Sequence, residues 1–348
     1  MNEPSVVLVT GGAGYVGSRL VPRLLAAGHR VRVLDALFFS NGLERCGHHP
    51  ALSLIKGDIR DRTAIEQSLR NVSTVIHLAA VANDPSFNAN PALSRSINID
   101  CLPHLIESAK GLGCKRFIYA SSASVYGINN APIVDENQPC VPITDYSRFK
   151  ADGEKFLFNF TSPSFETIAV RAATVCGASP RPRLDLTANL LTASALARGK
   201  ISVLGGAQYR PNVHIADLCR FYTVLVNRDS LGALCGHAIN LGEENYSVAE
   251  IAEQVKAVVE RYFATRISIT TAASDDMRSY RLDSRLVRQA FEFEFAHTVR
   301  DAVLELCDQW HSGAFADSTD VMRDPRFHNI LNMNVTDWSF VSAARRAC

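Results

Sequence analysis

A chain of 348 residues carries 36 lysine and arginine residues against 35 aspartate and glutamate residues, so its net charge is +1. This balance gives no electrostatic basis for binding nucleic acid or an anionic membrane surface, and it favours a small-molecule partner. The length is enough to bury a large core, and it suits one large domain or a main domain with a smaller lobe.

The cysteines and the N-terminal segment indicate the cellular compartment. The nine cysteines are scattered and include no Cys-x-x-Cys pair, which predicts reduced thiols, no metal site and no disulfide framework. The N-terminus runs directly into the short apolar segment 5–10, without the basic region or the long apolar stretch of a targeting or membrane-spanning segment. We therefore expect a soluble, cytoplasmic protein.

Short apolar runs alternate with helical stretches through the first half of the chain, a pattern typical of a parallel sheet covered by helices. The runs that we expect to form strands are 5–10, 29–35, 52–58, 74–80, 116–122 and 167–173. Ligands of such sheets bind beyond the carboxyl ends of the strands. Those ends carry Gly11, Asp35, Asp58, Ala79, Ser122 and Arg171.

A glycine-rich turn separates the first expected strand from an apolar helical run. Its glycines are Gly11, Gly12, Gly14 and Gly17. Glycine permits a tight turn and a close approach of the backbone to a pyrophosphate, and the N-terminus of the following helix supplies N–H donors. The glycine-rich turn therefore predicts a dinucleotide site. The alternative is that its glycines serve only the packing of the strand against the helix.

Asp35 ends the second expected strand, where a carboxylate can accept hydrogen bonds from the adenosine ribose and repel a 2′-phosphate. No arginine follows it directly, so NAD is favoured over NADP, although a solvated strand-end aspartate would look the same. Asp58 and Ile59 end the third strand, where they could contact adenine. Asp58 could instead cap the helix that begins near Asp61.

Tyr146 and Lys150 stand four residues apart on an expected helix, so both side chains point to the same face. A nearby ammonium favours phenolate, and we expect Lys150 to lower the pKa of Tyr146 from about 10 toward neutrality. Such a tyrosine could act as an acid and base on a substrate hydroxyl. The alternative is that the Tyr-x-x-x-Lys pair lies on a solvated helix and has no catalytic role.

The pattern becomes irregular after about residue 175, with a Pro/Arg-rich stretch at 179–185 and a helix-like run at 187–199. We expect an α/β fold, a doubly wound parallel sheet of Rossmann type with a smaller C-terminal α/β substrate lobe. The expected parts are an NAD-binding domain at 1–175 with returning segments near 207–245, an interleaved lobe at 176–312 and a polar tail of unclear role at 313–348.

Taken together, the motifs resemble the extended short-chain dehydrogenase/reductase family, particularly its nucleotide-sugar epimerases and dehydratases. The resemblance lies in TGGAGYVG (10–17), Asp35, GDIRD (57–61), HLAA (77–80), Asn98, YASSASVYG (119–127), Tyr146 with Lys150, QYRPNVHIADL (208–218) and DMRSYRLD (276–283). It implies cofactor contacts from Gly11, Gly14, Tyr15, Val16, Gly17, Asp35, Asp58, Ile59, Leu78, Ala79, Ala80, Tyr146 and Lys150.

The resemblance also implies catalytic and substrate-binding roles. Ser122 joins Tyr146 and Lys150 as a catalytic group, with its hydroxyl bonded to the reacting sugar oxygen. Arg210 and Arg278 become ligands of the nucleotide diphosphate. Further candidate contacts with the substrate are Asn83, Ser124, Thr174 and Asn189, although Asn83 in the loop 81–86 could instead form an Asx turn.

The chain departs from the family pattern at several positions. Dehydratases of the family place an acidic residue two positions after the catalytic Ser/Thr, but here Ala123 and Ser124 follow Ser122. Elimination of water needs a further acid and base, so the departure favours epimerisation. Pro211 and Thr174 replace an Asp and an Asn of many relatives, which puts the identity of the nucleobase and sugar in doubt.

The leading hypothesis is an NAD-dependent nucleotide-sugar epimerase that inverts carbon 4 through a transient 4-keto sugar. The alternatives are a nucleotide-sugar 4,6-dehydratase, decarboxylase, 3,5-epimerase or 4-ketoreductase of the same family, and a dinucleotide-binding sensor without turnover. The resemblance further implies a homodimer formed through segments near 92–111 and 147–160.

Overall fold

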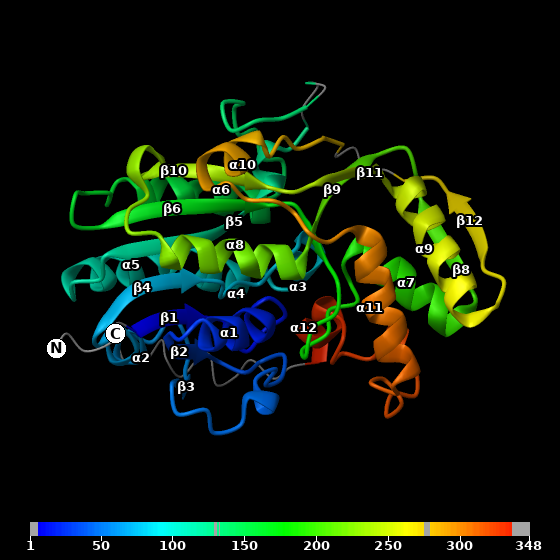
Figure 1. Cartoon of the computed structure of the whole chain (residues 1–348), viewed down its shortest axis with the longest axis horizontal. Helices are drawn as coiled ribbons and strands as arrows, with labels where there is room; N and C mark the ends of the chain where they lie inside the picture. The colour runs from blue at the N-terminus through cyan, green and yellow to red at the C-terminus, as the bar shows by residue number, and fades with distance from the viewer. Residues whose placement is uncertain (1–5, 129–130, 132, 275–278, 336–348) are drawn as a thin grey trace.

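The computed structural model describes residues 6–128, 131, 133–274 and 279–335. Its main element is a seven-stranded sheet with the strand order β10-β6-β5-β4-β1-β2-β3, in which every neighbouring pair is parallel (Figure 1). The strands are β1 Val6–Thr10, β2 Arg30–Asp35, β3 Leu52–Lys56, β4 Val72–His77, β5 Arg116–Ser122, β6 Glu166–Ala172 and β10 His237–Leu241. The Rossmann-type α/β prediction is therefore confirmed.

Both faces of this sheet are buried, as the continuous apolar runs of the sequence require. Along β1, Val7 and Val9 join one apolar cluster, while Val6 and Leu8 join a second cluster on the opposite face. The helices associated with the sheet are α1 Gly17–Ala26, α2 Arg62–Leu69, α3 Asp84–Ala89, α4 Pro91–Arg95, α5 Leu102–Gly111, α6 Asp145–Phe158, α8 Ile215–Asn227 and α10 Arg285–Phe291. Among the helices of the described ranges, none combines the length and apolarity needed to cross a bilayer.

A smaller lobe follows the main sheet and has its own apolar cluster. Its helices are α7 Thr187–Arg198, α9 Val248–Phe263 and α11 Val299–His311, and its parallel strand pair is β8 Lys200–Leu204 with β12 Ser268–Ala272. A three-stranded sheet with the order β11-β9-β7 contains β7 Thr174–Cys176, β9 Tyr209–His214 and β11 Glu244–Ser247. The division into domains stays a proposal, to which the return of β10 to the main sheet adds support.

The described part of the tail contributes side chains to the interior. Phe315, Val321 and Phe327 are buried in an apolar cluster with Leu184, and the backbone N–H of Leu184 donates to the carbonyl of Phe327 at 2.7 Å. The last helix, α12 Asn329–Val335, packs against α3 (Figure 1). The tail therefore reaches the same edge of the sheet at which the sequence predicts the site.

Candidate active site

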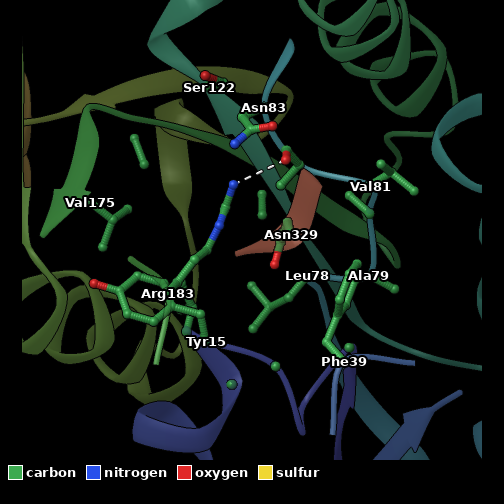
Figure 2. A pocket seen from close by; sticks show the side chains of 18 of the residues that line it. Tyr15, Phe39, Leu78, Ala79, Val81, Asn83, Ser122, Val175, Arg183 and Asn329 are labelled. Atoms are coloured by element: carbon green, nitrogen blue, oxygen red, sulfur yellow. Dashed lines mark hydrogen bonds between the residues drawn. The ribbon is translucent and has the colours of Figure 1, made fainter. Parts of the chain in front are cut away.

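A cavity of about 480 Å³ lies at the carboxyl ends of the central strands, where the fold predicts a ligand (Figure 2). Its lining contains most of the residues that the sequence singled out: Gly11, Gly14, Tyr15, Val16, Gly17, Asp35, Asp58, Ile59, Leu78, Ala79, Ala80, Asn83, Ser122, Ser124, Tyr146, Lys150, Thr174 and Arg210. Residues from both halves of the chain thus meet in one cavity.

The turn between β1 and α1 has the geometry of a pyrophosphate cradle. Gly11 adopts a φ of +70°, and a Cβ atom there would lie 2.7 Å from the backbone of Ala79, so only glycine fits. In the described part of the chain no side chain caps the N-terminus of α1, and its first turn carries no acidic residue. The N–H donors and the positive end of the helix therefore suit a dinucleotide.

The carboxylate of Asp35 lies at the end of β2 and is fixed by two backbone donors. Its Oδ2 accepts from the N–H of Ala13 at 2.9 Å, and its Oδ1 accepts from the N–H of Leu37 at 2.8 Å. Burial raises the pKa of Asp35, whereas these hydrogen bonds oppose the rise. Because each carboxylate oxygen has a second lone pair, the group can also accept bonds from ribose hydroxyls.

One of the two roles considered for Asp58 is wrong, because Asp61 caps α2. The Oδ1 of Asp61 accepts from the N–H groups of Thr63 at 2.8 Å and Ala64 at 3.4 Å. Asp58 instead forms an ion pair with Arg60 and lines the cavity. A contact between Asp58 and adenine stays a prediction.

Tyr146 and Lys150 lie in the first half of α6, which begins with a capping box. The hydroxyl of Thr144 accepts from the N–H of Ser147 at 3.2 Å, and the hydroxyl of Ser147 accepts from the N–H of Thr144 at 3.1 Å. This cap fixes where the helix starts, and both predicted side chains then face the cavity.

The predicted fall in the pKa of Tyr146 is wrong for the free protein. Burial raises the pKa of Tyr146 to about 12, and the charge that lowers it is the guanidinium of Arg183. The Nζ of Lys150 lies 5.9 Å from the centre of the Tyr146 ring and donates to the carbonyl of Ala120 at 2.6 Å. Burial also lowers the pKa of Lys150 to about 8.

Two serines complete this end of the cavity. The hydroxyl of Ser122 makes a hydrogen bond with Tyr146 that lowers the pKa of the tyrosine, and it accepts from the N–H of Ser124 at 3.2 Å. The hydroxyl of Ser124 is buried and has no hydrogen-bond partner among the described residues. Since a buried hydroxyl without a partner is costly, Ser124 suits a polar group of a ligand.

A buried ion-pair network behind α6 was not predicted from the sequence. Glu154 receives hydrogen bonds from Arg171 at 2.7 and 3.0 Å and from the hydroxyl of Ser121, and Arg171 also donates to the hydroxyl of Tyr126 at 2.8 Å. The charge of Glu154 favours the protonated form of Lys150. A signal was present, because Glu154 continues the four-residue spacing of Tyr146 and Lys150 along the same helix face.

A second missed group comes from the Pro/Arg-rich segment between β7 and α7. Figure 2 shows the guanidinium of Arg183 pointing toward Asn83. Its Nε donates to Asp185 at 2.9 Å, and its Nη2 donates to the carbonyl of Ala82 at 3.0 Å. Asn83 donates to Asp185 at 3.2 Å, so the segment is tied to the loop after β4. Two arginines and an aspartate at alternate positions were the signal for this group.

The predicted substrate contacts differ in where they lie. Asn83 uses its Oδ1 to accept from the N–H of Ser86 at 2.9 Å, so its oxygen caps the N-terminus of α3 and does not form an Asx turn with Pro85. Thr174 and Arg210 line the cavity on β7 and β9. Arg278 lies outside the described residues.

Asn189 does not line the cavity, because it is fully buried beneath the wall. Its Oδ1 accepts from the N–H of Gly177 at 3.0 Å, and its Nδ2 donates to the hydroxyl of Tyr15 at 3.1 Å and to the carbonyl of Arg183 at 2.9 Å. Asn189 therefore positions Tyr15 and Arg183.

No group of three or more metal-ligating side chains that could hold a metal ion occurs within the described ranges.

The chain is similar to known proteins over most of its length. UDP-glucose 4-epimerase of Lactobacillus helveticus is 28% identical over 324 residues, which cover 88% of this chain and 96% of that protein. UDP-glucose 4-epimerase 2 of Oryza sativa subsp. japonica is 30% identical over 278 residues, which cover 71% of this chain and 68% of that protein. The structure of MoeE5 in complex with UDP-glucose and NAD is 25% identical, with a TM-score of 0.74 over 89% of this chain and 100% of that chain.

A model of the family described as "NAD dependent epimerase/dehydratase family" matches residues 7–242. The match runs from β1, through the glycine turn and the Ser122, Tyr146 and Lys150 constellation, to the end of β10. It covers more than half of the chain, and the chain belongs to the NAD dependent epimerase/dehydratase family.

Proposed function

We propose that the protein is an NAD-dependent nucleotide-sugar epimerase that acts at carbon 4. The observation that carries the proposal is the meeting of Ser122, Tyr146 and Lys150 with a glycine cradle and Asp35 in one cavity. The epimerase relatives and the UDP-glucose and NAD of the MoeE5 structure support the cofactor and the substrate class.

The side chains divide the chemistry between them. Tyr146 removes the proton of the substrate 4-hydroxyl, and Ser122 holds the same oxygen through its hydroxyl. Lys150 lies on the same helix face and binds the nicotinamide ribose. NAD, when bound, accepts and returns the hydride. The transient keto sugar turns over in the cavity before this return, so that the hydride reaches the opposite face of carbon 4. Tyr146 then returns the proton, and the product is a stereoisomer of the substrate.

The residues after Ser122 argue against elimination. Ala123 and Ser124 bring no carboxylate to this edge of the cavity, whereas loss of water needs an additional acid and base. Incubation of the purified chain with a panel of nucleotide sugars tests the proposal by mass spectrometry and chromatography. A stereoisomer of unchanged mass is the expected product, and a product lighter by one water would contradict it.

Tyr146→Phe should lower epimerase turnover by about 10²- to 10⁴-fold, because the proton acceptor is lost. NAD binding should remain, since the ring still fills the wall of the cavity. Turnover and bound nucleotide are measured on the same preparation. Tyr262→Phe, a change of an exposed tyrosine on α9, is the matched control and should leave both values unchanged. Full turnover in Tyr146→Phe would refute the role.

The proposal includes a cytoplasmic homodimer. Phe149, Phe156 and Phe160, in and just after α6, remain partly exposed, which suits a face that packs against a second copy through α5 and α6. The eight described cysteines are free, in accord with a reducing compartment. Light scattering on the purified chain measures the oligomeric state, and a monomer at all concentrations would contradict the dimer.

A further inference from the structure

Arg181 is an almost fully buried cation in the wall of the cavity. It lies in the segment between β7 and α7, and only 2% of its surface is exposed. Its guanidinium stacks on the ring of Phe39 with its central carbon 4.8 Å from the ring centre. Phe39 and Arg181 both line the cavity, so the cation faces the space in which a dinucleotide would lie.

The guanidinium has fewer partners than its burial requires. Its Nη2 donates to the side-chain oxygen of Asn329 at 2.6 Å. Its Nε is buried without a hydrogen-bond partner in the described part of the chain, and no carboxylate there forms an ion pair with it. The neighbouring Arg183 is paired with Asp185 at 2.9 Å. Asp185 and Asp35 favour the charge of Arg181 only from a distance, without a direct ion pair. Because a buried charge that no carboxylate contacts directly is unfavourable, Arg181 suits an anionic ligand.

The position of Arg181 identifies the anion. Its backbone N–H donates to the hydroxyl of Ser18, in the first turn of α1, at 3.4 Å. A Cβ atom placed on Gly42 would lie 2.9 Å from the Cβ of Arg181, so the arginine packs closely against the loop that follows β2. It thus stands between the N-terminus of α1, which suits a phosphate, and the ribose end of the cavity.

We propose that Arg181 binds the pyrophosphate of the dinucleotide beside the N-terminus of α1, and that Asn329 of the tail positions the guanidinium for this contact. The inference rests on the proposed function only in taking NAD as the ligand. Asp35 faces the ribose end of the same cavity and would repel a 2′-phosphate, so the pyrophosphate is the anion that fits. A planar guanidinium matches two phosphate oxygens at once.

The test measures binding to the full-length chain freed of nucleotide, by calorimetry with NAD, ADP, adenosine and NADP. Arg181→Met should weaken NAD and ADP by about 10- to 100-fold, the usual effect of losing a charge-assisted hydrogen bond. Adenosine, which has no phosphate, should bind as before. Arg181→Lys, which keeps the charge, should lose less affinity than Arg181→Met. Arg323→Met, an exposed arginine of the tail, should bind every ligand like the wild type.

The unfolding temperature separates ligand binding from a structural role. Removal of a buried, unpaired charge should leave the nucleotide-free Arg181→Met protein at least as stable as the wild type, while the stabilisation by NAD shrinks. Unchanged affinities for NAD and ADP, or a loss confined to NADP, would overturn the proposal, as would a less stable protein with normal affinities. If Arg181→Met does not fold, Arg181→Lys decides by its affinity for ADP. If Arg181→Met weakens NAD binding as expected but the wild type epimerises no nucleotide sugar, the proposed function is refuted and the role of Arg181 is not.

Discussion

Tyr146 takes its electrostatic setting from several elements. Burial raises its pKa to about 12 and Asp84 of α3 raises it as well, whereas Arg183 and the hydrogen bond of Ser122 lower it. Lys150, on the same helix, directs its Nζ to the carbonyl of Ala120 and lies over the ring of Tyr119 at 4.9 Å. The base strength of Tyr146 therefore depends strongly on groups that are distant in the sequence.

Arg183→Met should move the rising limb of the pH–rate profile to higher pH by about one unit, because a nearby positive charge favours the phenolate and its loss raises the pKa of Tyr146. The quantity to measure is kcat/KM against pH. Arg183→Lys keeps the charge and should stay near the wild type, and Arg148→Met on the solvent side of α6 should show no shift. If the rising limb of the pH–rate profile of Arg183→Met stays at the wild-type pH, Arg183 does not act on the pKa of Tyr146.

At the scale of residues, the sequence predicted the groups whose relationship is local. The glycine turn and the four-residue spacing of Tyr146 and Lys150 are visible without a structure. The direction of the pKa shift of Tyr146 was predicted wrongly, because it depends on burial and on Arg183 from another segment. Arg181 was missed for a similar reason, since its position in the cavity depends on Asn329, 148 residues away.

At the scale of elements, the segment between β7 and α7 and the tail hold each other in place. The backbone N–H of Asn329 donates to Asp185 at 3.1 Å, and its side-chain oxygen accepts from Arg181 at 2.6 Å. The adjoining backbone bond between Leu184 and Phe327 adds a third tie. Asn98, in the π-helical turn before α5, similarly fixes the loop after β4 by bonds of 2.8 and 2.9 Å to the backbone of Val81.

Asn329→Ala should weaken NAD binding less than Arg181→Met, because the guanidinium remains but loses the bond that orients it. In the Arg181→Met background, Asn329→Ala should have little further effect, since the two residues act through one contact. Calorimetric affinities of the wild type, both single variants and the double variant measure the coupling. Additive losses would mean that Asn329 and Arg181 act independently.

The strands were predicted well and the tail poorly, for physical reasons. Each of the six expected strand segments contains or closely overlaps a strand of the main sheet, because buried parallel strands are apolar runs with polar ends. The tail has no such period. Its burial comes from contacts of Phe315 and Phe327 with α7, α11 and their neighbours, which a local pattern does not encode.

At the scale of the whole molecule, the cavity joins parts of the chain that are otherwise separate. Its lining runs from Gly11 in the first turn to Asn329 in the tail, and it includes residues on both sides of the β7–α7 segment. A ligand there contacts the main sheet, the smaller lobe and the tail together. Binding energy is therefore coupled to the folding of all three.

NAD at about 100 times its dissociation constant should stabilise the protein by about 3 kcal/mol, because it binds only the folded state. NADP at the same concentration should stabilise it less, since Asp35 opposes a 2′-phosphate. Differential scanning calorimetry over a range of nucleotide concentrations measures both effects. Equal stabilisation by the two nucleotides would contradict the preference for NAD.

The place of Asn329 in the cavity has a consequence for protein synthesis. Strands β1 to β6 are complete at residue 172, so the sheet can begin to form while the second half of the chain is still being translated, because folding proceeds from the N-terminus. The contact between Arg181 and Asn329 can form only after residue 329 has left the ribosome. Nascent chains stalled before residue 329 should therefore hold the dinucleotide weakly, if Arg181 binds its pyrophosphate as proposed.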